Sequence, residues 1–387
     1  MNANPSLLQN QLTTWLLRRT PANGVRRVAS LSAAIASDLG NVREDNQDRA
    51  AIARGWDRHG QEYALVAVAD GIGGMQDGVT CAAMTIGVFV AAVDQRAQNA
   101  SNSSDHPEEW LLEGAHAANQ ALFSRFHASG GSTLVALLLR PGTCPYWLSI
   151  GDSRVYCMNN KGLIQSSIDD TIAGQLGKNP EDAIEQSRLL QFVGMGADLE
   201  PHIAKLDADS TDAVILTTDG VHYLAPSPGW LGQIIHHSPD PGVCVKRFID
   251  LAKWCGGPDN ATVAMITLPV EMQSETRPAY PCLEVWDAYG ELQVINPASS
   301  KASPALILSP ATTSQSSPPP SVARLDLAID ERLGTSSPEQ SKSRRGKSSR
   351  KPKKSADKQS NGLDKLNEPE LPQLHMEFPT KSNNESL

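Results

Sequence analysis

The sequence predicts an α+β fold in which antiparallel sheets are covered by helices. Short apolar, strand-like runs are joined to their neighbours by turns, and two long helical segments stand early in the chain instead of alternating with the strands. This order disfavours repeated βαβ units and a parallel sheet. With 387 residues, of which 40% are apolar, the chain is long enough for one large domain with appendages.

The predicted elements begin with a short amphipathic helix in residues 1–20, where Leu8, Leu12, Trp15 and Leu16 recur at near-helical spacing. This helix either packs against the main domain or docks onto a partner or a membrane surface. The continuous apolar run 64–69 indicates a buried strand, and helices are expected at 78–97 and 107–128, the second with Asp105 as its cap. Further strands are expected at 132–139, 146–150, 154–158, 213–218 and 262–268, and a further helix at 241–255.

These elements suggest four regions. Residues 1–32 are assigned to an N-terminal extension, and residues 33–270 to the main domain. Alternating apolar residues in 271–297 surround a turn at 288–290, which indicates an additional hairpin. Residues 298–387 are rich in Ser, Pro and Lys, a composition typical of disorder.

The formal charge of −9 is unevenly distributed. Residues 301–387 contain 14 Lys and Arg against 10 Asp and Glu, which leaves −13 for residues 1–300. An acidic main domain suits cation binding and disfavours non-specific binding of nucleic acid there. The run 342–358 holds nine cations and one acid, so it is either a solvated tail or an attachment site for an anionic partner.

The six cysteines show no CxxC pair and no spacing of a zinc or disulfide framework, which indicates a reducing compartment. No stretch approaches the roughly 20 apolar residues of a membrane span. The N-terminus also lacks the basic start and apolar core of a secretory signal. We therefore expect a cytoplasmic protein.

Aspartates occur in five short segments, each at the end of an apolar, strand-like run. The segments are SDLGNVREDNQD (37–48), DGIGG (70–74), GDSR (151–154), DG (219–220) and DNAT (259–262). Carboxylates from distant strand ends can converge on one point, and Mg²⁺ and Mn²⁺ prefer oxygen ligands. The pattern predicts a two-metal phosphate-ester hydrolase. Asp70 is the expected bridging ligand, with the Gly71 carbonyl beside it, because glycine permits close backbone approach.

The order and wording of the five segments resemble the metal-dependent serine/threonine protein phosphatases of type 2C, in their bacterial form. The resemblance runs from about residue 33 to about residue 268, or roughly three fifths of the chain. A single DGxGG would be weak evidence, because Asp-Gly is common in ordinary turns. The family implies a β-sandwich of two antiparallel sheets flanked by helices on both faces, with the metal site at one edge between the sheets.

The resemblance also implies a ligand set for two Mn²⁺ or Mg²⁺ ions. Asp219 and Asp259 complete the carboxylates of one metal, whereas Asp70 and the Gly71 carbonyl serve the other. Asp48 matches an aspartate that acts in the outer shell, through water.

Two further positions bear on how many ions bind. Gln47 stands where the family often has Glu, which puts the second metal in question. Asp152 matches a position that binds a third, weaker metal in bacterial members. The alternative is that Asp152 caps a turn and orders Arg154.

Arg43 is the sole cation in residues 37–48 and matches the family's phosphate-contacting arginine. Its planar guanidinium can form two parallel hydrogen bonds with phosphoryl oxygens. The alternative is an ordinary surface salt bridge to Glu44 or Asp45.

A general acid is harder to assign. Some family members carry a histidine where this chain has Ile72, and many bacterial relatives carry one where it has Met75. Neither side chain can donate a proton, so protonation of the leaving group falls to water or to a histidine from elsewhere, such as His59 or His222. A lone histidine without a partner motif is more often structural.

Residues 169–205 correspond in position to the family's flap beside the active site, and the sequence predicts a helical stretch within them that ends near residue 190. We expect a phosphatase of phosphoserine and phosphothreonine in proteins, acting on the substrates of a cytoplasmic kinase. Three alternatives stay open. They are a phosphatase of a phosphorylated transcription regulator or a small metabolite on the same fold, a degenerate module that binds phosphoproteins without turnover, and a scaffold whose basic tail is the working part.

Overall fold

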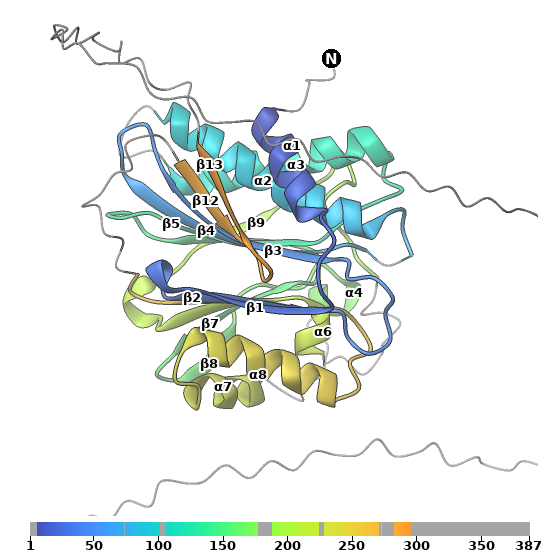
Figure 1. Ribbon diagram of the computed structural model, residues 1–387, viewed down its shortest axis with the longest axis vertical. Coiled ribbons are helices and arrows are strands. Elements are labelled where there is room, and N and C mark those ends of the chain that lie inside the picture. Colours follow the sequence, from blue (N-terminus) through green and yellow to red (C-terminus); the bar gives the residue numbers. More distant parts are fainter. Residues whose placement is uncertain are drawn as a thin grey trace, which may run out of the picture. The chain divides into compact units, whose positions relative to one another are not determined.

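Two antiparallel sheets stack face to face in this computed structural model, which describes residues 6–72, 74–100, 106–176, 188–223, 228–270, 272 and 282–295 (Figure 1). The six-stranded sheet has the order β1-β2-β11-β10-β7-β8, and the seven-stranded sheet the order β13-β12-β3-β4-β5-β6-β9. The strands of the first sheet are β1 (Asn23–Val28), β2 (Ala33–Asp38), β7 (Arg154–Asn159), β8 (Gly162–Gln165), β10 (Ala213–Thr217) and β11 (Ala261–Thr267). Those of the second are β3 (Asp48–Trp56), β4 (Glu62–Asp70), β5 (Leu134–Leu139), β6 (Tyr146–Ile150), β9 (His202–Lys205), β12 (Cys282–Trp286) and β13 (Glu291–Ile295).

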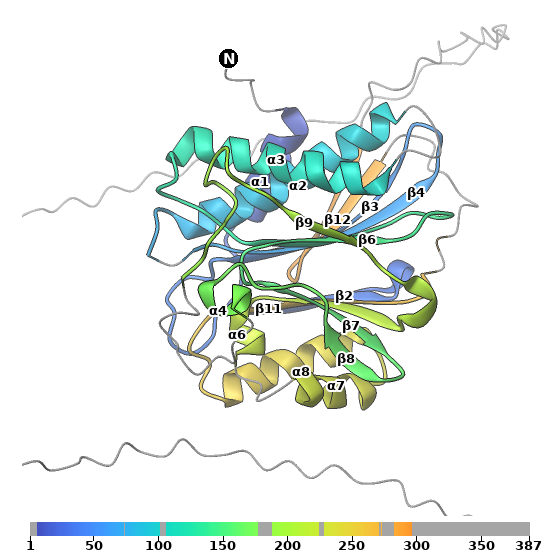
Figure 2. The ribbon, with the colours of Figure 1, turned by 180° about the vertical axis from the view of Figure 1, so that it is seen from behind.

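Helices cover the outer face of each sheet, which gives four layers (Figures 1 and 2). The seven-stranded sheet is covered by α1 (Leu7–Leu16), α2 (Gly78–Asn99) and α3 (Pro107–Phe126). The six-stranded sheet is covered by α7 (Pro228–His236) and α8 (Pro241–Trp254). This arrangement confirms the predicted fold class.

The strand β4 explains why an apolar core lies on each face of the seven-stranded sheet. Every residue from 63 to 69 is apolar and buried, and successive side chains of a strand point to opposite faces. Alternate residues therefore enter two different cores. Those facing the helices are Tyr63, Leu65, Ala67 and Ala69. Those facing the other sheet are Ala64, Val66 and Val68.

Helix α2 qualifies the expectation that no apolar stretch of the chain is long enough to span a membrane. Among the described residues, this one helix is long and apolar enough, and 72% of its apolar window is buried within the fold. It packs against α1, α3, β3 and β4. Its apolar composition is thus explained by burial as a core helix.

The N-terminal segment is built into the domain. Ser6 and Gln9 form a capping box at the start of α1, whose Leu12 and Leu16 are buried. The helix lies so close to α2 that a Cβ on Gly87 would stand 2.6 Å from the Thr13 hydroxyl oxygen. The residues assigned to a separate extension therefore include a packed helix, in agreement with the packing alternative.

The strand β1 was missing from the sequence prediction. It pairs with β2 along its whole length and forms one edge of the six-stranded sheet. Its sequence NGVRRV is largely polar, and the burial pattern shows exposed and half-buried residues up to Val28. An edge strand of this kind carries little apolar signal, because few of its side chains enter a core.

The chain returns to the seven-stranded sheet after the main domain. β12 and β13 pair as a hairpin, and β12 also pairs with β3, so the additional hairpin extends this sheet. The helix α3 begins after His106 rather than at the predicted cap. Asp105, most of 271–281, the segment 177–187 and the whole of 296–387 lie outside the described residues.

The packing of α1 generates the first prediction. Leu16→Ala removes a side chain that is only 1% exposed and should lower the free energy of unfolding by about 2–5 kcal/mol, as cavities in cores do. Leu7→Ala, in the same helix but 75% exposed, is the matched control and should change it by less than about 0.5 kcal/mol. Urea unfolding followed by circular dichroism measures both. Equal effects would contradict a packed α1.

Candidate functional site

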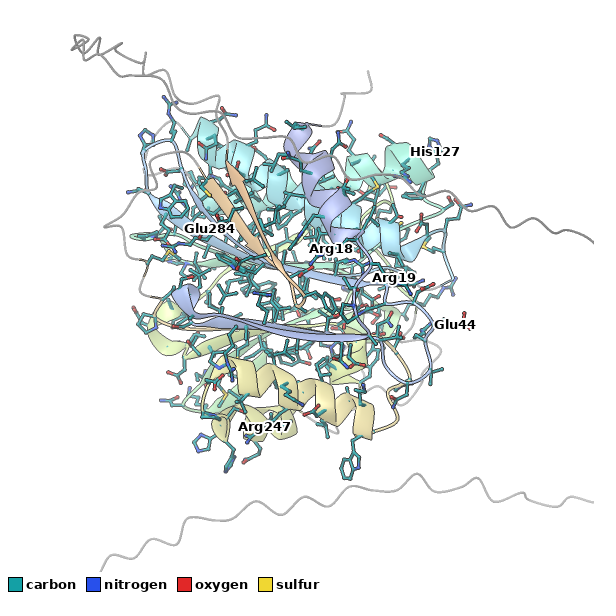
Figure 3. All side chains as sticks on the ribbon, in the orientation of Figure 1. Arg18, Arg19, Glu44, His127, Arg247 and Glu284 are labelled. Atoms are coloured by element: carbon teal, nitrogen blue, oxygen red, sulfur yellow. The ribbon has the colours of Figure 1, made fainter. Side chains whose placement is uncertain are left out.

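The five aspartate segments meet at one edge of the sandwich. Asp48 begins β3 and Asp70 ends β4, and the two residues are directly paired in the register of that hairpin. Asp219 follows β10, and Asp259 precedes β11, the antiparallel partner of β10. Asp152 follows β6. In Figure 3 the label of Glu44 marks the loop between β2 and β3 at this edge.

Asp48 is buried, and only one of its carboxylate oxygens is satisfied. Thr218 donates a hydrogen bond to Oδ2 at 2.9 Å, whereas the buried Oδ1 has no partner among the described residues. Burial raises the pKa of Asp48 to about 6, and the Asp259 carboxylate adds to this rise against the hydrogen bonds of Thr262 and Thr218. A buried carboxylate with a free oxygen is a suitable partner for a cation.

Asp70 stands among the other four carboxylates. Burial raises its pKa well above the usual range, and the charges of Asp48, Asp219, Asp152 and Asp259 raise it further, in that order. Each of these groups lies near enough to disfavour the ionised form of Asp70. Thr133, directly before β5, fixes the Asp70 backbone: its N–H donates to the Asp70 carbonyl at 2.8 Å, and its hydroxyl accepts from the Asp70 N–H at 2.9 Å.

The Gly71 carbonyl lies beside an amide oxygen of Gln47. Both oxygens are close to Gly78 at the start of α2: a Cβ there would lie 2.8 Å from Gln47 Oε1 and 2.9 Å from Gly71 O. A Cβ on Gly71 itself would lie 2.1 Å from the Gly78 carbonyl oxygen, so only glycine fits. The Gln47 amide, which stands where the resembled family often has a carboxylate, and the predicted carbonyl ligand thus both approach the start of α2.

Asp219 begins the one-turn helix α6 (Asp219–His222) and is half-buried. Its Oδ1 is buried without a partner among the described residues. Burial raises its pKa well above the usual range, with additional repulsion from Asp152, Asp259 and Asp48. A Cβ on Gly220 would lie 1.9 Å from the Asn260 carbonyl oxygen, so the DG and DNAT segments are in direct backbone contact.

Asp152 is buried, and burial, followed by the charge of Asp169, raises its pKa to about 6. The alternative role of ordering Arg154 belongs to another residue, because Asp169 binds that guanidinium at 2.6–3.1 Å. The Asp152 carboxylate is near its own backbone N–H and the Tyr223 hydroxyl, which lies 3.5 Å from Oδ2. Asp152 is therefore free to face the other carboxylates.

Arg43, in the loop between β2 and β3, contacts the cluster of carboxylates at Asp259. Its Nη2 lies 2.7 Å from Asp259 Oδ2, and this hydrogen bond raises the pKa of Arg43, with Asp219 and Asp70 contributing. The salt bridge predicted as the alternative, to Glu44 or Asp45, is absent from the ion pairs of the described residues. With 46% of its side chain exposed, Arg43 is accessible to an incoming anion.

The two histidines considered as acids have different surroundings. His59 sits in the turn between β3 and β4, at the opposite end of these strands from Asp48 and Asp70, and its ring faces the Ala100 carbonyl at 3.2 Å. His222 is buried, with Nδ1 2.9 Å from the Thr217 hydroxyl, and burial holds its pKa well below the usual range. His59 is thus held far from the carboxylates, whereas His222 lies in the same one-turn helix as Asp219, with its buried Nε2 unpartnered among the described residues.

Buried hydroxyl groups hold the site together, and sequence reasoning missed them. Thr133 accepts a hydrogen bond from the Asp70 backbone N–H at 2.9 Å, and its hydroxyl lies 2.7 Å from that of Ser153 beside Asp152. Thr218 links Asp48 on one sheet to the Thr262 backbone on the other. The sequence signal that could have identified these hydroxyl groups is their position beside or within the acidic segments.

The flap region is anchored beside Asp152 at both ends. Asp170 accepts a hydrogen bond from the Gly151 N–H at 2.8 Å, and its own carbonyl accepts one from the Leu190 N–H at 2.7 Å. Its carboxylate also contacts His202 on β9 at 2.8 Å. The predicted helix is described only as the short α4 (Ile172–Gln175).

The donor set fits hard divalent cations. It consists of carboxylate, amide and carbonyl oxygens, and two buried carboxylate oxygens have no competing donor. Among the described residues, no three His, Cys, Asp or Glu side chains already surround a single ion-sized point. The oxygen ligands are therefore chemically suited to such ions.

Comparison with known proteins agrees with this geometry. A profile of the family described as protein phosphatase 2C matches residues 41–244. The chain is 26% identical over 242 residues to the serine/threonine phosphatase stp of Listeria welshimeri, which covers 59% of this chain and 93% of the relative. It is 29% identical over 258 residues to the phosphatase PstP of Mycobacterium tuberculosis, covering 62% of this chain and 46% of PstP.

The fold has a solved counterpart. The PPM Ser-Thr phosphatase MsPP of Mycobacterium smegmatis, crystallised with cacodylate, superposes with a TM-score of 0.52 at 30% identity, covering 62% of this chain and 99% of MsPP.

Asp48 gives a prediction of pH dependence. Its folded pKa of about 6 exceeds the ordinary value of 3.8, so its contribution favours folding at low pH and is lost as pH rises through about 6. In chelator, Asp48→Asn should therefore stabilise the protein at pH 7.5, by up to about 3 kcal/mol, and change little at pH 4. Thermal and urea unfolding at both pH values measure this.

The control is Asp45→Asn, an equal charge change at an exposed residue of the same loop. It should shift stability by less than about 0.5 kcal/mol at either pH. Destabilisation by Asp48→Asn of the same size at pH 4 and pH 7.5 would refute a strained carboxylate.

Proposed function

Because the chain belongs to the protein phosphatase 2C family, we propose that it removes phosphate from phosphoserine and phosphothreonine in proteins at a centre of two Mn²⁺ or Mg²⁺ ions. The observation that supports this most directly is the environment of Asp70. Four other carboxylates raise its pKa, and such an assembly of negative charge at one edge calls for cations.

The ligands would divide into two groups. Asp70 and the Gly71 carbonyl would hold one ion, and Asp219 and Asp259 would hold the other. When bound, the cations supply an activated water and neutralise the charge that develops on the phosphoryl oxygens. Asp48 supports the centre from behind through its unpartnered Oδ1.

The number of ions depends on two residues. Gln47 places a neutral amide oxygen beside the Gly71 carbonyl, so the ion on that side has one fewer negative ligand and is held more weakly. Asp152, buried and not paired with Arg154, is the residue for a third, weaker ion.

Arg43 binds the phosphoryl group. Its guanidinium is partly exposed and contacts Asp259 through Nη2. The planar fork can therefore engage a phosphoryl oxygen while it stays next to a ligand of the centre. This contact orients the ester for attack.

Protonation of the leaving oxygen falls to water. Ile72 and Met75 have no proton to donate, and His59 lies at the opposite end of β3 and β4. Burial holds the pKa of His222 well below its usual range, which disfavours the protonated form that a general acid needs. On this side of the site, Ile72 and Phe192 lie against Gly131: a Cβ there would be 3.1 Å from Ile72 Cδ1 and 2.4 Å from Phe192 Cδ2. The wall next to the DGIGG segment is thus apolar.

The substrate class is supported by the relatives. Both stp and PstP carry the description of serine/threonine phosphatases. The chain spans about half the length of PstP, so the proposal extends to the catalytic activity and not to other functions of PstP. The proposed substrates are proteins phosphorylated by a serine/threonine kinase in the same cell.

Hydrolysis of p-nitrophenyl phosphate and of a phosphothreonine peptide, with Mn²⁺, with Mg²⁺ and with chelator, tests this function. We expect turnover that requires the metal, falls by at least about a hundredfold in Asp219→Asn, and is kept in Asp209→Asn, a control at an exposed aspartate. Arg43→Ala should chiefly raise KM for the peptide, because it removes a contact to the phosphoryl group.

Two results would redirect the conclusion. Tight, metal-dependent binding of the phosphopeptide without turnover would favour the phosphoprotein-binding module. Turnover of small esters together with inactivity on phosphopeptides would favour a phosphatase of another substrate class.

A further inference from the structure

The tip of the β12–β13 hairpin, residues 287–290, extends from the seven-stranded sheet towards β1 of the other sheet (Figure 1). Ala288 is buried in the core between the sheets. The contact with β1 is close, since a Cβ on Gly24 would lie 2.5 Å from the Tyr289 ring and 2.7 Å from the Ala288 carbonyl oxygen. The tip is therefore a packed part of the sandwich.

Asp287 fixes the tip to the end of α1. Its carboxylate accepts hydrogen bonds from the backbone N–H groups of Tyr289 at 2.8 Å and Gly290 at 2.7 Å, which closes the turn. Arg18 binds the same carboxylate at 2.8 Å and stacks over the Trp15 ring at 4.1 Å. Asp287 is buried, so this ion pair is better shielded from water than a surface one.

Tyr289 carries this anchoring to the loop before Asp48. Its hydroxyl lies 3.4 Å from Asn46 Nδ2 and 3.5 Å from the Ser37 carbonyl oxygen. These distances are at the long end of hydrogen bonding, so the hydroxyl contributes only weak hydrogen bonds. The packing of the ring therefore adds to the hydroxyl in restricting the Asn46 side chain. Asn46 in turn accepts the Asp48 backbone N–H at 3.0 Å and donates to the Ser37 hydroxyl at 2.9 Å.

Arg49 joins the same cluster from the strand side. Its guanidinium donates to the carbonyls of Leu16 at 2.8 Å, Asn46 at 2.8 Å and Asp48 at 2.6 Å. The end of α1, the hairpin tip and residues 46–49 are thus held together. Both α1 and the hairpin lie outside the residues that the family profile matches.

We propose that Tyr289 is a positioning residue for the metal centre, which acts through Asn46 on Asp48. The C-terminal hairpin thereby contributes to the affinity of the centre, because Asn46 holds the Asp48 backbone N–H and so helps to orient the carboxylate with its free oxygen. This inference rests on the proposed function. Groups behind metal ligands typically change metal affinity by about 10–100-fold when removed.

The experiment measures Mn²⁺ binding to the full chain, by electron paramagnetic resonance of free Mn²⁺ and by calorimetry. Tyr289→Phe keeps the ring and removes the hydroxyl, and should weaken Mn²⁺ binding about three- to tenfold. Asn46→Ala should weaken it about 10–100-fold. If Tyr289 acts on Asp48 through Asn46, the double variant should bind like Asn46→Ala alone.

Tyr63→Phe is the matched control, since it removes a buried tyrosine hydroxyl bound to Asp94 at 2.7 Å, near the opposite end of β4 from Asp70. It should lower the melting temperature and leave Mn²⁺ affinity unchanged. A merely structural role for Tyr289 would give the same result as this control.

Unchanged Mn²⁺ affinity in Tyr289→Phe, or additive losses in the double variant, would overturn the inference. Failure of the wild-type chain to bind Mn²⁺ would overturn both it and the proposed metal centre. Mn²⁺ binding with the expected coupling, but without phosphatase turnover, would sustain the inference and reject only the proposed activity.

Discussion

Mutual repulsion among five carboxylates is the constraint on which this structure depends. Asp48 and Asp70 come from one sheet hairpin, Asp219 and Asp259 from a strand pair of the other sheet, and Asp152 from a third connection. Burial and repulsion both raise the pKa values of four of these groups. Folding the chain therefore assembles an unfavourable charge distribution, which bound cations would relieve.

The rest of the sandwich keeps that distribution in place. Three continuous apolar cores fix the two sheets and their helices, and hydroxyl groups cross between the sheets where the apolar layer ends. Thr218 and Thr133 each hold a segment that carries an aspartate, through contacts of 2.9 Å. Directional bonds of this kind orient a charged group more tightly than packing alone does.

Elements far from the acidic segments in sequence take part as well. Arg49 connects the last turn of α1 to the backbone of Asp48, and Arg18 connects α1 to the hairpin tip at Asp287. The N-terminal helix and the C-terminal hairpin thus brace one side of the edge. The flap segments brace another side, through Asp170 and Gly151.

The sequence alone determined the fold class, most of the strands, and the acidic segments, because these depend on local periodicity and on residue types with narrow chemistry. The run 64–69 indicated a buried strand, and DGIGG and GDSR placed carboxylates at strand ends. Tertiary structure decided what local pattern does not encode. The polar edge strand β1 exists because β2 offers it a partner, and Asp169, not Asp152, binds Arg154.

Only the tertiary structure also revealed that Tyr289, 241 residues after Asp48, lies in the same cluster. Contacts of this kind depend on which surfaces meet when the sheets stack. The local sequence around a residue does not indicate a partner that lies hundreds of residues away. The types of residue that could form the site are thus fixed by sequence. Their partners and their charge states are fixed by burial and by neighbours that the fold brings together.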